Sequence, residues 1–154
     1  MAEKTLTSSS FRLRVDLLAP HIMSAMEAFD AATDKVSLPA SLLELVRTRA
    51  SQINGCAFCV GAHSPAALEA GATQKQLLAL PVWRESPHFS AQERAALTLT
   101  EAITQMDRRP VTDEMWGEVS VVLTEVELAE LVWVIAAINV WNRVAGTARP
   151  WPVA

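Results

Sequence analysis

The only two cysteines of this 154-residue chain lie three positions apart, and a histidine follows four positions after the second. They stand in the segment INGCAFCVGAHSPAALEAG, residues 53–71, as Cys56, Cys59 and His63. On a helix, this spacing places all three side chains on one narrow face. His63 is then the i+4 neighbour of Cys59 and can act on it as a base. The spacing is typical of dithiol redox chemistry, in which one sulfur attacks and the other resolves the intermediate.

The two cysteines differ in what would make each of them reactive. Cys56 falls in the first turn of the expected helix, where unpaired backbone N–H groups and the helix dipole favour a thiolate. Cys59 has the histidine as its neighbour, and a nearby base also raises the thiolate fraction. These two effects favour different sulfurs, so the spacing leaves the attacking cysteine open.

Two other interpretations use the same three residues. Zinc binds cysteine and histidine, but a structural zinc site needs four ligands and usually takes them in pairs from separated segments. Alternatively, the cysteines are small buried apolar residues and the histidine lies on the surface. The redox interpretation predicts two reactive thiols and needs no bound cofactor.

The elements that must position these residues are helices, and the pattern predicts an all-α fold of about seven. Pro20 can open one helix, and a second is expected over about 39–53, where Asn54-Gly55 ends it. The cysteine-bearing helix is expected over 56–70, with Gly71 as its end and a bend at Pro65. Three S/T-x-x-E/Q capping boxes predict further helix starts, at Thr73 with Gln76, Ser90 with Glu93, and Thr124 with Glu127.

The remaining segments complete a one-domain organisation. A short helix is expected after Thr112, and the last one runs from the third capping box to Gly146. Residues 81–89 form the one substantial loop, residues 1–10 a polar tail, and residues 11–154 a single helical domain. The last helix is apolar nearly all round, so we expect part of it to be buried against another subunit in a homo-oligomer.

Composition and charge exclude several classes of partner. The net charge is −4 and the 13 basic residues are scattered, which does not fit a nucleic-acid binder. The polar start is unlike a secretory signal, and the apolar run near 131–140 is too short to span a bilayer. We therefore expect a soluble, cytoplasmic protein that binds neither nucleic acid nor membrane. In the cytoplasm, two thiols are more often catalytic or metal-binding than joined in a structural bridge.

The segment ELVRTRASQINGCAFCVGAHSPAALEAGAT resembles the core motif of alkylhydroperoxidase D (AhpD)-like proteins in the carboxymuconolactone decarboxylase superfamily. That motif is a glutamate, eleven residues, then C-x-x-C-x-x-x-H, and it is met here by Glu44, Cys56, Cys59 and His63. The later stretches FSAQERAALTLTEAIT and IAAINVWNRVAG also resemble an uncharacterised branch of the family. The resemblance implies an AhpD-like helical fold and a homo-oligomer, a trimer or a hexamer.

The resemblance also implies roles for the matched residues. Cys59 would attack the peroxide, Cys56 would resolve the sulfenic acid to a disulfide, His63 would be the base, and Glu44 would orient and charge-balance it. By its own helix pattern Glu44 would be a solvated surface residue, on the side opposite the apolar stripe. Phe58 stands where the founding member has a second histidine, so the proton relay must run directly from His63 or through water.

The function that follows is thiol-dependent peroxide reduction or disulfide exchange. The resemblance implies a small hydroperoxide as substrate and a thiol or lipoyl-type partner as reductant. The alternatives are a lyase of the related decarboxylase type, which does not depend on a cysteine pair, and a non-catalytic metal-binding oligomer.

Other polar and aromatic residues attract attention without forming a motif. His21 and His88 have no partner within sequence reach and are expected on the surface. Asn139, Asn142 and Arg143 are polar groups on or beside a buried helix, for which we favour structural hydrogen bonds over substrate contact. The sequence does not place Trp83, which is a candidate for the mouth of a pocket.

Overall fold

The computed structural model describes residues 11–153, and these form eight α-helices and one 3₁₀ segment, with no strand among them. The all-α prediction is therefore confirmed for this part of the chain, while the expected polar tail, residues 1–10, lies outside it. The elements in order are α1 (Val15–Leu18), α2 (Pro20–Thr33), α3 (Ala40–Asn54), α4 (Ala57–Glu69), α5 (Gln74–Ala79), η1 (Leu80–Glu85), α6 (Ala91–Thr104), α7 (Asp113–Ser120) and α8 (Glu125–Ala148).

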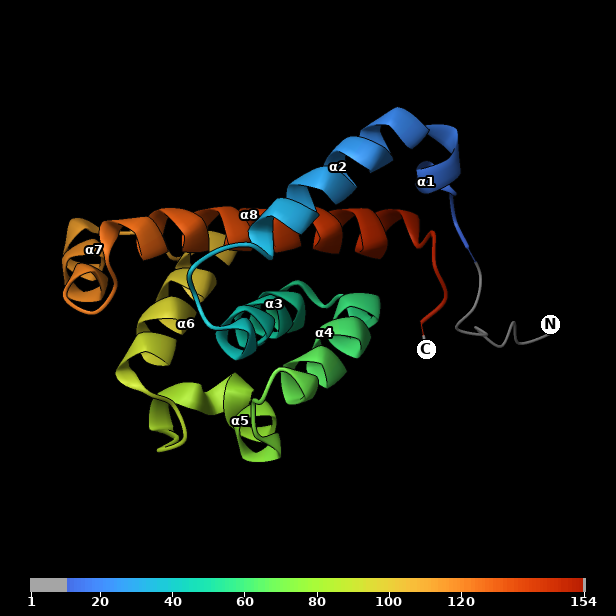
Figure 1. The fold of residues 1–154 in the computed structure, drawn as a ribbon. Coiled ribbons are helices and arrows are strands. Elements are labelled where there is room, and N and C mark those ends of the chain that lie inside the picture. The colour runs from blue at the N-terminus through green and yellow to red at the C-terminus, as the bar shows by residue number, and fades with distance from the viewer. Residues whose placement is uncertain (1–10, 154) are drawn as a thin grey trace.

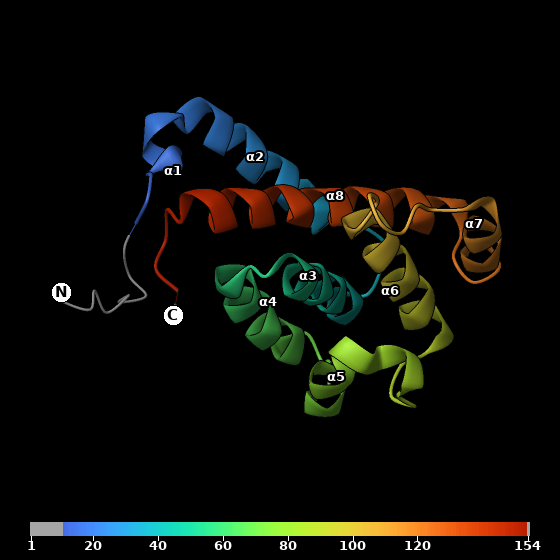
Figure 2. The ribbon, with the colours of Figure 1, turned by 180° about the vertical axis from the view of Figure 1, so that it is seen from behind.

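The long helix α8 runs the length of the molecule, with α2 on one side of it and α3, α4 and α6 on the other (Figure 1, and from behind in Figure 2). Helix α3 is central, because it contacts α4, α6 and α8. Its Leu45, Val46 and Thr48 are fully buried. This central position brings one face of α3 against the cysteine-bearing helix α4.

Local sequence signals determine most of the helix ends. All three predicted capping boxes form, with side chain and backbone bonded reciprocally at Thr73, Ser90 and Thr124. Gly55 ends α3 in the left-handed conformation, with φ of 66°, which glycine adopts without a steric penalty. Pro20 opens α2 at its first turn, as predicted.

One detail agrees with the sequence-based expectation and two differ from it. Helix α4 continues through Pro65 as one helix, as expected, and the Gly61 carbonyl that Pro65 leaves without a donor belongs to an exposed residue that water can hydrate. The first half of the expected loop 81–89 is the 3₁₀ segment η1, anchored by buried Leu80 and Trp83. The short helix α1 was not expected, since four residues are too few to carry a periodic signal.

Helix α8 extends two residues beyond the predicted end at Gly146, because Arg149 rather than a glycine adopts the left-handed cap, with φ of 44°. Over its 24 residues α8 is long and apolar enough to cross a membrane, which the shorter run 131–140 alone is not. Half of its most apolar window is nevertheless buried inside the fold, as in a core helix. Its other side leaves Val126, Trp133 and Val140 exposed.

Candidate active site

Cys56 and Cys59 meet at the start of α4. The left-handed turn at Gly55 reverses the chain, and Cys56 then caps α4, with its Sγ accepting a hydrogen bond from the Cys59 backbone N–H at 3.3 Å. The Cα atoms lie 5.4 Å apart and the two sulfurs are joined in a disulfide. Each residue is only 3% exposed. The pair is thus buried, preorganised by the helix start and in its oxidised form.

His63 lies one turn along α4 from Cys59 and is held by a carboxylate from α3. Its Nδ1 stands 2.8 Å from Oε2 of Glu44. With a carboxylate as acceptor, Nδ1 carries the proton in this bond, so Nε2 is left free for proton transfer. The side chains of His63 and Glu44 are 24% and 12% exposed. The i,i+4 spacing predicted from the sequence therefore forms, and the candidate orienter Glu44 contacts the candidate base.

Interpreting Glu44 by its own pattern as a solvated surface residue was wrong. Helix α3 is enclosed by α4, α6 and α8, so even the polar side that carries Thr48 and Ser51 is fully buried. Burial raises the pKa of the Glu44 carboxyl, but the hydrogen bonds from His63 and Arg47 lower it more, and the net pKa lies below its ordinary value. Glu44 is thus held ionised beside the imidazole.

Arg47 is a site residue that sequence reasoning missed. Its guanidinium is buried and donates to Oε1 of Glu44 at 2.6 Å through Nη1. Through Nη2 it also donates to Asp34 at 2.6 Å and to Thr33 at 3.0 Å, at the end of α2. The available signal was the i,i+3 spacing of a glutamate and an arginine on one helix, but the link to α2 depends on the tertiary fold. A chain of hydrogen bonds therefore runs from the end of α2 through Arg47 and Glu44 to His63.

Two cavities flank the cysteine pair, and each is lined by one of the cysteines. The first, about 310 Å³, we call the His63 cavity; α2, α4, α8 and the C-terminal segment line it. Its lining residues are Met23, Glu27, Asp30, Phe58, Cys59, Ala62, His63, Trp141, Ala145 and Trp151. It brings together Cys59, the candidate base and an apolar wall.

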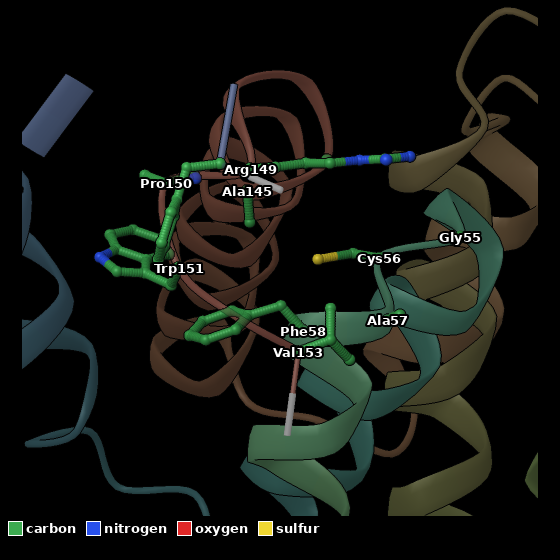
Figure 3. A pocket seen from close by; sticks show the side chains of 11 residues that line it. Gly55, Cys56, Ala57, Phe58, Ala145, Arg149, Pro150, Trp151 and Val153 are labelled. Atoms are coloured by element: carbon green, nitrogen blue, oxygen red, sulfur yellow. The ribbon is translucent and has the colours of Figure 1, made fainter. Parts of the chain in front are cut away.

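The second cavity, about 300 Å³, lies on the Cys56 side, and we call it the Arg149 cavity. Figure 3 shows the Cys56 sulfur directed into it, with Arg149 along one side and Phe58 and Trp151 on another. Its lining residues are Phe11, Gly55, Cys56, Ala57, Phe58, Ala145, Gly146, Arg149, Pro150, Trp151 and Val153. No sequence motif pointed to this cavity, because its walls come from both ends of the described chain.

Phe58 belongs to an aromatic cluster rather than to a proton relay. Its ring lies 5.1 Å from that of Trp151, which in turn lies 6.0 Å from that of Trp141. Phe58 and Trp151 line both cavities, so the cluster forms the wall between them. Phe58 has no group to transfer a proton, which leaves His63 as the titratable side chain next to Cys59 on α4.

The polar residues of α8 have structural partners, as favoured from the sequence. Asn54 at the end of α3 donates to Oδ1 of Asn139 at 3.0 Å and to Oδ1 of Asn142 at 2.8 Å. Asn142 donates in turn to Ser51 at 2.9 Å, and Arg143 donates to Asn139. These bonds fasten α3 to α8 directly beside the turn that leads into Cys56.

The remaining candidates lie away from the cysteines. Trp83 is buried and donates its indole N–H to Glu101 at 3.0 Å, so it does not stand at the mouth of either cavity. Glu101 also accepts from Arg49, Arg84 and Arg109. His21 and His88 are exposed, as expected. Within residues 11–153, no three His, Cys, Asp or Glu side chains converge as metal ligands would.

Comparison with known proteins places this arrangement in context. Residues 20–102 match the sequence model of the carboxymuconolactone decarboxylase family. The uncharacterized protein YdfG of Bacillus subtilis is 36% identical over 83% of this chain and 87% of its own length. The uncharacterized protein YnjA of Escherichia coli is 43% identical over 58 residues, 38% of this chain and 32% of its own.

Solved structures share the fold. A protein of unknown function from Agrobacterium tumefaciens, a candidate antioxidant defence protein AhpD, superposes with a TM-score of 0.89 at 30% identity. The match covers 94% of this chain and 99% of that one. The debrominase Bmp8 superposes with a TM-score of 0.79 over 89% of this chain and 74% of its own, at 20% identity, which is a likeness of fold alone.

Proposed function

The chain belongs to the carboxymuconolactone decarboxylase family, and we propose that it works there as an AhpD-like thiol oxidoreductase that reduces a small hydroperoxide. One observation carries the proposal: the Cys56–Cys59 redox pair adjoins a cavity in which Cys59 and the Glu44-bound His63 both take part. A buried thiol next to an oriented base is the arrangement by which cysteine nucleophiles are activated.

The chemistry begins from the reduced pair. Nε2 of His63 takes the proton of the Cys59 thiol, and the Glu44 carboxylate, held in place by Arg47, stabilises the imidazolium that forms. The Cys59 thiolate attacks the terminal peroxide oxygen and the O–O bond breaks. The other oxygen takes the proton back from the His63 imidazolium and leaves as an alcohol. Cys59 is then a sulfenic acid. The Cys56 thiol attacks its sulfur, water leaves, and the disulfide of the present structure forms.

Three further features belong to the proposal. The reductant is a thiol or a lipoyl-type partner, since the disulfide must be reduced again after each turnover. The working form is a homo-oligomer, a trimer or a hexamer, supported by the exposed apolar residues Val126, Trp133 and Val140 along α8. The protein works in the cytoplasm, where a reducing thiol pool is present.

The first experiment is the intact mass of the fully reduced protein after one equivalent of cumene hydroperoxide. Wild type should lose two hydrogens rapidly. Cys56→Ser should gain one oxygen, trapped by dimedone as the Cys59 sulfenic acid, and Cys59→Ser should gain none. An unchanged mass in all three proteins would show that peroxide is not the oxidant and would refute the proposal.

A lyase of the decarboxylase type is the competing function within the family. It does not use a cysteine pair, so it predicts that turnover of a small lactone acid survives alkylation of both thiols. Under the proposed function, alkylation with iodoacetamide abolishes turnover of the hydroperoxide, and the lactone acid is not consumed.

A further inference from the structure

The two sulfurs of the disulfide adjoin different cavities. Cys59 lines the His63 cavity and does not line the Arg149 cavity, whereas Cys56 lines the Arg149 cavity and not the other. The aromatic pair Phe58 and Trp151 forms the wall between them. Each cysteine is 3% exposed, so the cavity that each one lines is its described opening to a reagent.

The charges of the two cavities also differ. The His63 cavity carries two carboxylates, Glu27 and Asp30, beside the histidine. In the Arg149 cavity Arg149 is the one charged residue among the lining side chains, and it takes part in no ion pair among residues 11–153. The rest of that lining is mostly apolar or aromatic. An anion is therefore favoured on the Cys56 side and disfavoured on the Cys59 side.

Building on the proposed function, we propose that the Arg149 cavity is the binding site of the reductant, a small dithiol on an apolar chain that ends in a carboxylate. Its volume of about 300 Å³ lies at the lower end of the range for small-molecule sites. Phe58, Trp151 and Val153 contact the chain, and Arg149 binds the carboxylate. The peroxide enters from the His63 cavity, so oxidant and reductant do not compete for one entrance.

The separation of the two sulfurs determines the order of the exchange. One thiolate of the reductant attacks Sγ of Cys56, the sulfur that faces the Arg149 cavity (Figure 3). A bond forms between these two sulfurs, the Cys56–Cys59 bond breaks, and its electron pair leaves on Cys59, which takes a proton from His63. The second thiol of the reductant then attacks its own sulfur in the mixed disulfide. Cys56 leaves as a thiol, and the reductant becomes a cyclic disulfide.

The first test fills one cavity at a time with a matched pair of substitutions. Ala57 and Ala62 are both exposed residues of α4; Ala57 lines only the Arg149 cavity and Ala62 only the His63 cavity. Reduction by dihydrolipoate and oxidation by cumene hydroperoxide are followed separately by stopped-flow tryptophan fluorescence. Ala57→Leu should lower the ratio of the reduction to the oxidation rate constant about tenfold, and Ala62→Leu should raise it about tenfold. A shift of this ratio in the same direction for both variants, or no shift, would overturn the proposal.

The second test examines the carboxylate with two reductants that differ only in that group, dihydrolipoate and dihydrolipoamide. The quantity compared is the rate constant with dihydrolipoate divided by the rate constant with dihydrolipoamide. Arg149→Gln should lower this ratio about threefold, because an exposed ion pair is worth under about 1 kcal/mol. In wild type, 1 M salt should lower the same ratio by screening. Arg108→Gln removes one positive charge outside both cavities and should leave the ratio at the wild-type value. An unchanged ratio in Arg149→Gln, or an equal fall in Arg108→Gln, would refute this site.

These measurements separate the two proposals. The protein is first oxidised with diamide, so its reduction can be measured even if hydroperoxides never react with it. Failure of wild type to react with hydroperoxide would remove the proposed function and leave the Arg149 result standing. Normal peroxide oxidation with no Arg149 dependence would remove the reductant site alone.

Discussion

Replacing Glu44 by glutamine tests whether the carboxylate acts on Cys59 through His63. The Glu44 carboxylate accepts at both oxygens, from His63 at 2.8 Å and from Arg47 at 2.6 Å. An amide of the same shape accepts on one side only. If the oxygen of the glutamine amide faces His63, the NH₂ group of the amide faces the Arg47 guanidinium. Two hydrogen-bond donors then oppose each other.

The magnitude follows from the bond that is lost. A hydrogen bond to a charged group contributes about 1.5–3 kcal/mol, so removing it from the imidazolium–carboxylate pair should slow thiolate-dependent reaction of Cys59 by about 10–100-fold. The free energy of unfolding should fall by about 1–3 kcal/mol, because buried Arg47 keeps only the exposed Asp34 as its charged partner.

The assay is alkylation of Cys59 by iodoacetamide at pH 7 in a Cys56→Ser background, followed by intact mass, with urea unfolding as the check on folding. Glu127→Gln is the matched control, since it removes one carboxylate at the start of α8 and glutamine still completes a capping box. His63→Ala should slow alkylation at least as much as Glu44→Gln. The orienting role of Glu44 would be refuted if His63→Ala slowed the alkylation strongly while Glu44→Gln left the alkylation rate within twofold of that of the Cys56→Ser parent.

Three further outcomes concern stability and are all measured by urea unfolding. Asn142→Ala should cost about 1–3 kcal/mol, because it removes a buried side chain that donates to buried Ser51 and accepts from Asn54 at the α3–α8 contact. A cost under half of the lower figure would show that the contact tolerates the loss. Burial raises the pKa of Glu101, but its arginine and tryptophan partners lower it more, to a net value below 4.5. The stabilisation by Glu101 is therefore complete above pH 4.5 and is lost as the pH falls through the lower folded-state pKa. The difference in free energy of unfolding between wild type and Glu101→Gln should thus shrink on acidification from pH 7. A difference that stays constant would contradict this. Ser90→Ala should cost about 1 kcal/mol by removing the cap of α6, whereas Ser90→Asp should restore most of it.

The amino-acid sequence by itself determined what depends on neighbours along the chain. The three capping boxes and the left-handed end at Gly55 form as predicted, and Cys59 and His63 lie one turn apart on α4 and line one cavity. Each depends on residues three or four positions apart, so no tertiary contact is needed to specify it. The all-helical class followed from the same local signals.

Only the tertiary structure decided what surrounds the cysteines. The helix pattern of α3 placed Glu44 in water, but the packing of α4 and α8 around α3 buries it and aims it at His63. Arg47 gained its partner Asp34 from another helix, and the Arg149 cavity arose where the two ends of the described chain meet. These contacts join residues far apart in sequence, and their geometry depends on how whole helices pack, which periodicity within one helix does not encode.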